Sequence, residues 1–281
     1  MKTQYYADGV WSGARTIALP IGAHGLWNSA AVFDGARSIR RMAPDLLTHC
    51  QRLVEAAPSM LLQSPLTAAE IMDICVEGIL RFPKDAELYL TPLLFSTGDD
   101  LIPAPGTTRF MLSVRESPIQ TKGFAACSGT HVIRPAPGTM QTRFKTSWLY
   151  ANAIPARKQA LDRGFDEALM LDPSGNVVEF STSNLWLVRD GQLITPEENG
   201  SFLPGITRRR ILSLLQQQGV TVEQRPVTVD DISSADEIFS TGNSNKVRPV
   251  TRMDGRALKP GLVFEQVRKI YWDYAATQRV A

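Results

Sequence analysis

Residues 202–210, Phe-Leu-Pro-Gly-Ile-Thr-Arg-Arg-Arg, join a helix start to positive charge where negative charge is expected. The Pro-Gly pair precedes an apolar-periodic run, which predicts a helix. Free N–H groups make a helix N-terminus electropositive, so acids usually occupy the first turn. Here that turn holds three arginines and no acid. The backbone of Gly205, Ile206 and Thr207 could therefore bind a phosphate or carboxylate. The alternative is a plain helix start with its arginines on a solvated face.

A second loop, Ser240 to Lys246, follows a strand-like run and is rich in glycine, serine and asparagine. These residue types allow several backbone N–H groups to converge on an anion. An ordinary turn is the alternative interpretation. Two such loops in one domain could hold a single phosphate.

Lys145 is the candidate nucleophile or base. It lies in a predicted strand-to-helix transition, just before the aromatic residues Trp148 and Tyr150. Apolar surroundings disfavour the ammonium form of a lysine, which can then act as a nucleophile or base near neutral pH. A solvated lysine in a turn is the alternative.

Glu179 ends the run Asn-Val-Val-Glu-Phe, where strand alternation places it on the same face as Val177. Its carboxylate is either an exposed strand end or a buried partner for a cation, such as a protonated pyridine nitrogen. His49 and Arg52 lie three residues apart on one predicted helix face. They are most simply a polar helix edge.

The composition of the 281-residue chain is that of a soluble globular protein, with 43% hydrophobic and 21% charged residues. A net charge of +2 is too near zero to indicate a nucleic-acid partner. The three cysteines fit neither a disulfide framework nor a metal site, because they are odd in number and far apart. We expect a cytoplasmic protein without a membrane partner, because no signal peptide or run of about 18 apolar residues occurs.

The pattern along the chain predicts an α+β fold with mainly antiparallel or mixed sheets. Strands grouped into hairpins alternate with helices, and the glycine signatures of Rossmann and P-loop units are absent. Thr67 and Glu70 form a capping-box pattern. The predicted helices are 44–57, 67–80, the segment ending at Gly219, and 264–275; the predicted strands are 87–95, 109–115, the hairpins 167–180 and 184–196, 221–228, 238–243, and a hairpin around Asp254-Gly255.

Taken in order, these segments resemble the fold-type IV pyridoxal-phosphate enzymes, in particular the branched-chain and D-amino acid aminotransferase group. The resemblance covers nearly the whole chain. It is carried by Val-Phe-Asp-Gly-Ala-Arg (32–37), His-x-x-Arg-Leu (49–53), Phe-Lys-Thr-Ser-Trp-Leu-Tyr (144–150), Gly-x-Val-x-Glu-x-x-x-x-Asn-Leu (175–185) and Leu-Pro-Gly-Ile-Thr-Arg (203–208).

The resemblance implies roles for particular residues. Lys145 would form the Schiff base with the cofactor and then act as the base, while Glu179 would hold the pyridine nitrogen protonated. Tyr150 would contact the phenolic oxygen and Leu203 would pack on the ring. The implied cofactor-binding set is Arg52, Lys145, Tyr150, Glu179, Leu203, Gly205, Ile206, Thr207, Gly242 and Asn243, with Arg52 on the phosphate. The implied substrate set is Phe33, Arg37, Tyr89, Asn243 and Ser244.

The resemblance also implies two domains, a small α/β domain at 1–115 and a larger cofactor-binding domain at 124–281, joined by a linker at 116–123. It implies a homodimer with the cofactor between the domains. Arg208 matches the family motif, whereas Arg209 and Arg210 are interpreted as a solvated face.

Three departures from the family concern the substrate. Thr91 replaces an arginine, Asn243 replaces a threonine, and Asn28 stands where a pocket tyrosine is common. The leading hypothesis is an aminotransferase that moves an amino group from a small, branched-chain or hydrophobic amino acid, or an amine, to a 2-oxo acid. An (R)-selective amine or D-amino acid aminotransferase is the first alternative. A lyase of the aminodeoxychorismate type and a polyanion-binding protein are the others.

Overall fold

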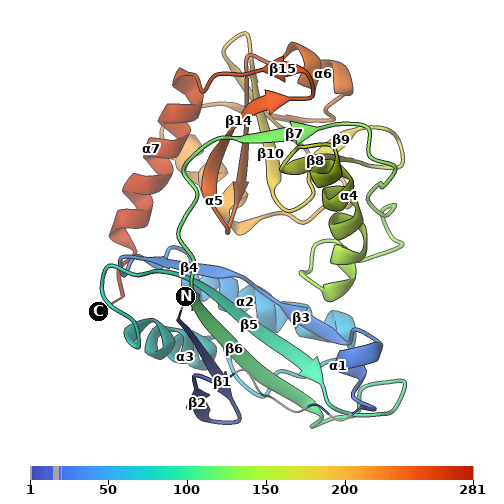
Figure 1. Ribbon diagram of the computed structural model, residues 1–281, viewed down its shortest axis with the longest axis vertical. Helices are drawn as coiled ribbons and strands as arrows, with labels where there is room; N and C mark the ends of the chain where they lie inside the picture. Colours follow the sequence, from blue (N-terminus) through green and yellow to red (C-terminus); the bar gives the residue numbers. More distant parts are fainter. Residues whose placement is uncertain (1, 15–18, 20, 281) are drawn as a thin grey trace. The chain divides into compact units, whose positions relative to one another are not determined.

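The computed structural model describes residues 2–14, 19 and 21–280 (Figure 1). The chain divides into two compact units, which are described separately. Unit 1 comprises Met1–Ile119, Phe144–Trp148 and Ala275–Ala281, and unit 2 comprises Gln120–Arg143 and Leu149–Tyr274.

This division differs from the expected domain boundaries in two segments. Residues 144–148, which contain Lys145, and the C-terminal residues belong to unit 1. Phe144 packs against the core of unit 1, and the N–H of Phe33 donates to the carbonyl oxygen of Lys145 at 3.1 Å. Such contacts between distant segments leave no trace in local sequence patterns.

Unit 1 is built on a six-stranded antiparallel sheet in the order β2-β1-β6-β5-β3, with β4 also pairing with β5. Two helices, α2 and α3, pack against one face of this sheet. The elements are β1 (Thr3–Ala7), β2 (Val10–Ser12), α1 (His24–Trp27), β3 (Ala31–Phe33), β4 (Ala36–Ile39), α2 (Leu46–Ala56), a 3₁₀ turn (Ala57–Met60), α3 (Ala68–Leu80), β5 (Glu87–Ser96) and β6 (Thr108–Glu116).

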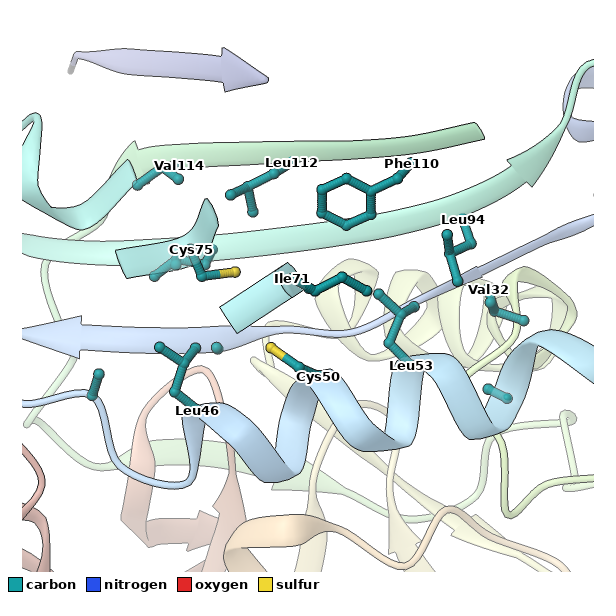
Figure 2. Packing of buried hydrophobic residues seen from close by; sticks show 14 of the residues in the cluster. Val32, Leu46, Cys50, Leu53, Ile71, Cys75, Leu94, Phe110, Leu112 and Val114 are labelled. Atoms are coloured by element: carbon teal, nitrogen blue, oxygen red, sulfur yellow. The ribbon is translucent and has the colours of Figure 1, made fainter. Parts of the chain in front are cut away.

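Strand alternation separates the two faces of this sheet. Residues Leu112 and Val114 of β6 are buried, and with Cys50 and Leu53 of α2 they form the core shown in Figure 2. The predicted capping box of α3 is confirmed, because Thr67 and Glu70 bond each other's backbone N–H groups. The predicted helices and strands of this unit are thus found, each within a few residues of its expected ends.

Unit 2 is built on a nine-stranded mixed sheet in the order β12-β11-β10-β13-β14-β7-β8-β9, with β15 on β14. An additional pairing between β9 and β10, through Glu179 and Asn184, closes part of the sheet on itself. Apolar residues of these strands fill the interior, among them Phe124, Phe180 and Leu185. Closure leaves fewer unpaired edges. It also brings the ends of β9 and β10 together.

The strands and helices of unit 2 follow the predicted hairpins closely. Asp190 and Gly191, both at positive φ, make the tight turn between β10 and β11 that the sequence predicts. The elements are β7 (Phe124–Cys127), α4 (Tyr150–Asp162), β8 (Glu167–Leu171), β9 (Val177–Phe180), β10 (Asn184–Arg189), β11 (Gln192–Pro196), α5 (Ile206–Gln217), β12 (Val222–Arg225), α6 (Val229–Ser234), β13 (Glu237–Gly242), β14 (Lys246–Met253) and β15 (Arg256–Ala257). A 3₁₀ turn (Ser147–Leu149) and α7 (Leu262–Thr277) each have residues in both units.

The α+β class with antiparallel and mixed sheets is therefore confirmed. Among the described helices, none is both long enough and apolar enough to cross a bilayer. The three cysteines are free and buried.

Candidate active site

The start of α5 is held by the side chain of Asn184. The Oδ1 atom of Asn184 accepts from the N–H of Gly205 at 3.1 Å, and its Nδ2 atom donates to the carbonyl oxygen of Leu203 at 2.9 Å. A Cβ atom on Gly205 would overlap Asn184 Oδ1, so this close approach requires glycine. The first helical bond runs from Arg209 N–H to Gly205 C=O. The amides of Ile206 and Thr207 precede it, in the turn whose N–H groups have no acceptor within the helix.

The arginines of this helix do not form one solvated face. Arg208 is fully buried. Its terminal nitrogens donate to Glu198 Oε1 at 2.8 Å and to Pro196 C=O at 2.7 Å. Burial lowers the pKa of Arg208, although the Glu198 carboxylate opposes this shift. Arg209 is exposed, whereas the guanidinium of Arg210 lies 4.4 Å from the Tyr274 ring centroid. Arg208 therefore braces α5 against β11, and the solvated-face interpretation is wrong for it.

Glu179 is buried on β9, and the exposed strand end is ruled out. Its Oε1 atom lies 2.7 Å from Arg134 Nη2, and its Oε2 atom accepts from Asn184 Nδ2 at 3.2 Å. Arg134 is also buried and donates to the carbonyl oxygens of Leu149 and Ser181. A buried carboxylate that faces a guanidinium is stabilised as the ion, and the ion is an acceptor only. Glu179 is thus a fixed hydrogen-bond acceptor.

The turn between β13 and β14 contributes an amide with a defined orientation. Lys246 Nζ donates to Asn243 Oδ1 at 2.7 Å, which fixes Nδ2 as the outward donor end. This Nδ2 atom is buried and has no hydrogen-bond partner among the described residues. Gly242 precedes it at the end of β13, close to Ser183, and Ser244 follows in the exposed part of the turn. The loop is therefore more than an ordinary turn, because it presents Asn243 Nδ2 as a hydrogen-bond donor.

Asn184 brings these three parts of unit 2 together. It stands opposite Glu179 on one neighbouring strand and opposite Thr241 on the other. Its side chain bonds Glu179 and both sides of the loop that starts α5. A carboxylate, a helix N-terminus and the Gly242–Asn243 loop consequently meet around the first residue of β10.

In unit 1, His49 and Arg52 are buried, so the interpretation as a polar helix edge is wrong. Both bind Asp34, which joins β3 to β4. Arg52 Nε and Nη2 bind the two oxygens of Asp34 at 2.7 and 2.9 Å, and His49 Nδ1 lies 2.7 Å from Oδ1. Burial alone would raise the pKa of Asp34, but the charges and hydrogen bonds of Arg52 and His49 outweigh it and hold that pKa well below its usual range. The buried Nη1 of Arg52 has no partner among the described residues.

Lys145 lies between a turn and the 3₁₀ turn Ser147–Leu149, and it is half-buried. Its Nζ atom is 5.0 Å from the centroid of the Phe33 ring. Tyr150 is the first residue of α4 in unit 2. An aromatic neighbour for the lysine is therefore present.

The residues expected at the substrate carboxylate lie on the sheet of unit 1. Arg37 of β4 is buried and stands opposite Tyr89 of β5, with its guanidinium 5.2 Å from the ring centroid. Burial lowers the pKa of Arg37 to about 10. Thr91 follows two residues after Tyr89 on the same face, and Asn28 ends the short helix α1.

Three residues of these clusters escaped the assignment from sequence. Asp34 is visible only within the family-like segment 32–37, and Asn184 only as a motif position. Arg134 belongs to no pattern at all, because the residue it binds lies 45 positions later in the chain.

The chain is similar to known aminotransferases over almost its whole length. The model of the amino-transferase class IV family matches residues 31–253. A putative branched-chain-amino-acid aminotransferase of Methanocaldococcus jannaschii is 31% identical over 269 residues, covering 94% of this chain and 93% of the relative. The branched-chain-amino-acid aminotransferase of Pseudomonas aeruginosa is 30% identical, with 96% and 85% covered.

Solved structures agree with this similarity. The crystal structure of an aminotransferase from Brucella abortus, bound to the cofactor pyridoxal phosphate, has a TM-score of 0.94 and 36% identity, and covers 98% of this chain and 100% of that one. The branched-chain aminotransferase of Thermoproteus uzoniensis with norvaline has a TM-score of 0.89 and 25% identity, with 99% and 96% covered.

Proposed function

The chain belongs to the class IV aminotransferase family and is a pyridoxal-phosphate-dependent aminotransferase, and we propose that it moves the amino group of a small branched-chain or hydrophobic amino acid to a 2-oxo acid. The names of the relatives support this choice of donor, as does the norvaline bound to the Thermoproteus enzyme. The observation that carries the proposal is the grouping of Glu179 and the α5 N-terminus around Asn184, which also pairs with Thr241 just before the Gly242–Asn243 loop.

That grouping suits the two ends of the cofactor. The ring nitrogen needs an anionic acceptor, and the phosphate needs N–H donors. Glu179 supplies the acceptor, with Arg134 holding its other oxygen. The Ile206 and Thr207 amides and Asn243 Nδ2 supply donors. The family resemblance adds Arg52, whose buried Nη1 has no partner among the described residues while Asp34 binds the other two nitrogens of that guanidinium. The residues present therefore fit the cofactor.

We assign the proton transfer to Lys145. When bound, the cofactor supplies an electron sink for the pair released at the substrate Cα. Lys145 Nζ would hold the cofactor's aldehyde carbon covalently at rest. With its amine free, Lys145 would take up and return the proton at the substrate Cα. Glu179 would keep the ring nitrogen protonated throughout.

The remaining roles follow the family resemblance. Tyr150 would donate to the phenolic oxygen and Leu203 would pack on the ring. On the substrate side, Phe33 would line the pocket, and Arg37 and Tyr89 would face a carboxylate together with the Asn243–Ser244 turn. We also propose a homodimer, which sedimentation of the purified protein would test.

A panel of donors tests the proposal. Holoenzyme is mixed with L-leucine, L-valine, norvaline, D-alanine or (R)-1-phenylethylamine, with 2-oxoglutarate or pyruvate as acceptor, and the cofactor's visible absorbance is followed. We expect the L-amino acids to react fastest. Faster reaction of D-alanine or the (R)-amine would favour the alternative donor class. Pyruvate release from a chorismate-derived amine without an acceptor would favour the lyase.

Variants test the residue roles. Lys145→Ala should abolish the half-reaction with every donor, because the variant lacks the amine that takes the proton from the substrate Cα. The control is Lys158→Ala, which removes an exposed lysine paired with Asp162 on α4. Normal turnover in Lys145→Ala would show that the base is another residue. Glu179→Gln should retain the cofactor yet lose most of its rate, because a neutral amide does not hold the ring nitrogen protonated.

A further inference from the structure

Three side chains lie in register across neighbouring strands of unit 1. Arg37 of β4 stands opposite Tyr89 of β5, and Tyr89 stands opposite Arg115 of β6. All three lie on the face away from the helices, because the adjacent residues Leu88 and Val114 are buried in the core. Val114 is labelled in that core in Figure 2. The face of the sheet opposite the helices therefore carries a cation, an aromatic ring and a second cation in one row.

The ring of Tyr89 contacts both cations. The guanidinium carbon of Arg37 is 5.2 Å from the ring centroid and that of Arg115 is 4.8 Å from it. These are cation–π distances. The two like charges repel each other, and Arg115 contributes to the lowered pKa of Arg37 after the larger effect of burial. An anion bound beside them would relieve this repulsion.

The two arginines differ in how they are held. Arg37 is buried and donates to the carbonyl oxygen of Ser117. Arg115 is exposed and makes no hydrogen bond or ion pair with any described residue. Its guanidinium instead makes a cation–π contact with the Tyr89 ring. Glu87, which is on the same face, brings one negative charge near Arg37, but its Oε2 accepts from Ile119 N–H. The row as a whole remains positive.

We propose that Arg115, together with Arg37 and Tyr89, binds a carboxylate group of the substrate and so determines which substrates the enzyme accepts. A guanidinium presents a fork of N–H donors that matches a carboxylate in two parallel bonds. The Tyr89 ring lies against both guanidinium groups on the face of the sheet opposite the helices. The inference rests on the proposed function, because it concerns the substrate of that reaction.

The position of Arg115 allows it to distinguish substrates by the number of carboxylates they carry. Thr91 and Ser113, the next facing pair on the same side of the sheet, carry hydroxyl groups and no charge. Of the arginines that β6 carries on this face, Arg115 stands opposite Tyr89, whereas Arg109 stands opposite Phe95 at the other end of the strand. A substrate with a second carboxylate, such as a five-carbon dicarboxylic acid, can bind the Arg115 guanidinium with it. A substrate with an apolar side chain makes no such contact.

The test compares Arg115→Gln with the unchanged holoenzyme on three donors: L-glutamate with two carboxylates, L-leucine with one, and sec-butylamine with none. The cofactor's absorbance gives kcat and KM for each half-reaction. We expect kcat/KM to fall about 10- to 100-fold on a donor whose carboxylate Arg115 binds, mainly through KM, because a hydrogen bond to a charged group is lost. The amine should be unaffected.

The pattern of loss identifies the carboxylate. A fall confined to glutamate assigns Arg115 to the side-chain carboxylate, and a fall with leucine as well assigns it to the α-carboxylate. Arg115→Lys should recover part of the loss. An equal fall for all three donors, or no fall for either amino acid, overturns the proposal. Arg109→Gln, an exposed arginine at the other end of β6, is the matched control and should change none of the three.

A second readout does not depend on turnover. Succinate, which cannot react, is titrated into the holoenzyme by calorimetry. We expect binding that Arg115→Gln weakens about 10-fold or more and that Arg109→Gln leaves unchanged. If the enzyme failed to transaminate any donor but bound succinate in this way, the proposed function would fail and the carboxylate site would stand. Equal binding by Arg115→Gln, or no binding by the unchanged enzyme, would remove the site.

Discussion

Replacing Asn184 with alanine removes a side chain that three segments of unit 2 share. The side chain is buried, accepts from Gly205 N–H at 3.1 Å, and donates to Leu203 C=O at 2.9 Å and to Glu179 Oε2 at 3.2 Å. Alanine makes none of these bonds. The substitution therefore leaves one donor and two acceptors without their partner at the end of β10.

The free energy of this change follows from the three bonds. Each buried polar group left without a partner costs about 1–3 kcal/mol. Water can enter the space left by the amide, and Glu179 retains Arg134, so the low end of that range applies. The sum is about 3 kcal/mol of unfolding free energy. For chains of this size Tm should then fall by roughly 6–12 °C, at about 2–4 °C per kcal/mol.

The assay is differential scanning calorimetry of the apo and holo forms, with cofactor affinity measured in parallel. Affinity should fall as well, because the variant frees both the Glu179 carboxylate and the loop that starts α5. The matched control is Asn176→Ala in the turn between β8 and β9, where the amide donates only to Asp172 at 3.0 Å and is half-buried. A Tm change in Asn184→Ala no larger than in this control would show that Asn184 does not join the three segments.

Three further outcomes are expected. Gly205→Ala should lower both Tm and cofactor affinity, because its Cβ would overlap Asn184 Oδ1 and force the α5 start to shift; unchanged values for both would contradict the close approach. Arg208→Met should lower the unfolding free energy by about 2–4 kcal/mol, since buried acceptors lose a charged donor, as measured by urea titration; a loss under 1 kcal/mol would mean that the guanidinium is not a brace. Asp34 has a folded-state pKa below its unfolded value of about 3.9, so the unfolded state binds the extra proton, and its contribution to stability is present above that pH and is lost as the pH falls. Asp34→Asn should therefore flatten the decline of Tm below roughly pH 5. A decline as steep as in the unchanged protein would show that Asp34 does not cause it.

Local patterns in the sequence predicted most of the secondary structure. The capping box at Thr67 and Glu70 marks the start of α3, and Asp190-Gly191 marks the turn between β10 and β11. Such signals act over a few residues, so each is complete within one stretch of the chain. The same holds for Lys145 and Glu179, whose neighbours in sequence make them candidates for the reactive groups.

Pairing between distant segments was beyond those patterns. No periodicity in the sequence predicts that β9 pairs with β10, or that β7 pairs in parallel with both β8 and β14. Strand order and register depend on which buried faces fit together, and a local pattern only says that a face is apolar. The same reason explains why no local pattern places residues 144–148 in unit 1.

The charged residues show the division most clearly. From sequence alone, the residue types and their order determined that the chain is an aminotransferase of this family and that Lys145 and Glu179 are its candidate reactive groups. Only the tertiary structure decided the partners: Arg134 for Glu179, and Asp34 for Arg52. A buried charge must be paired, and its partner is whichever residue the folded chain brings within about 3 Å, however far away it lies in sequence.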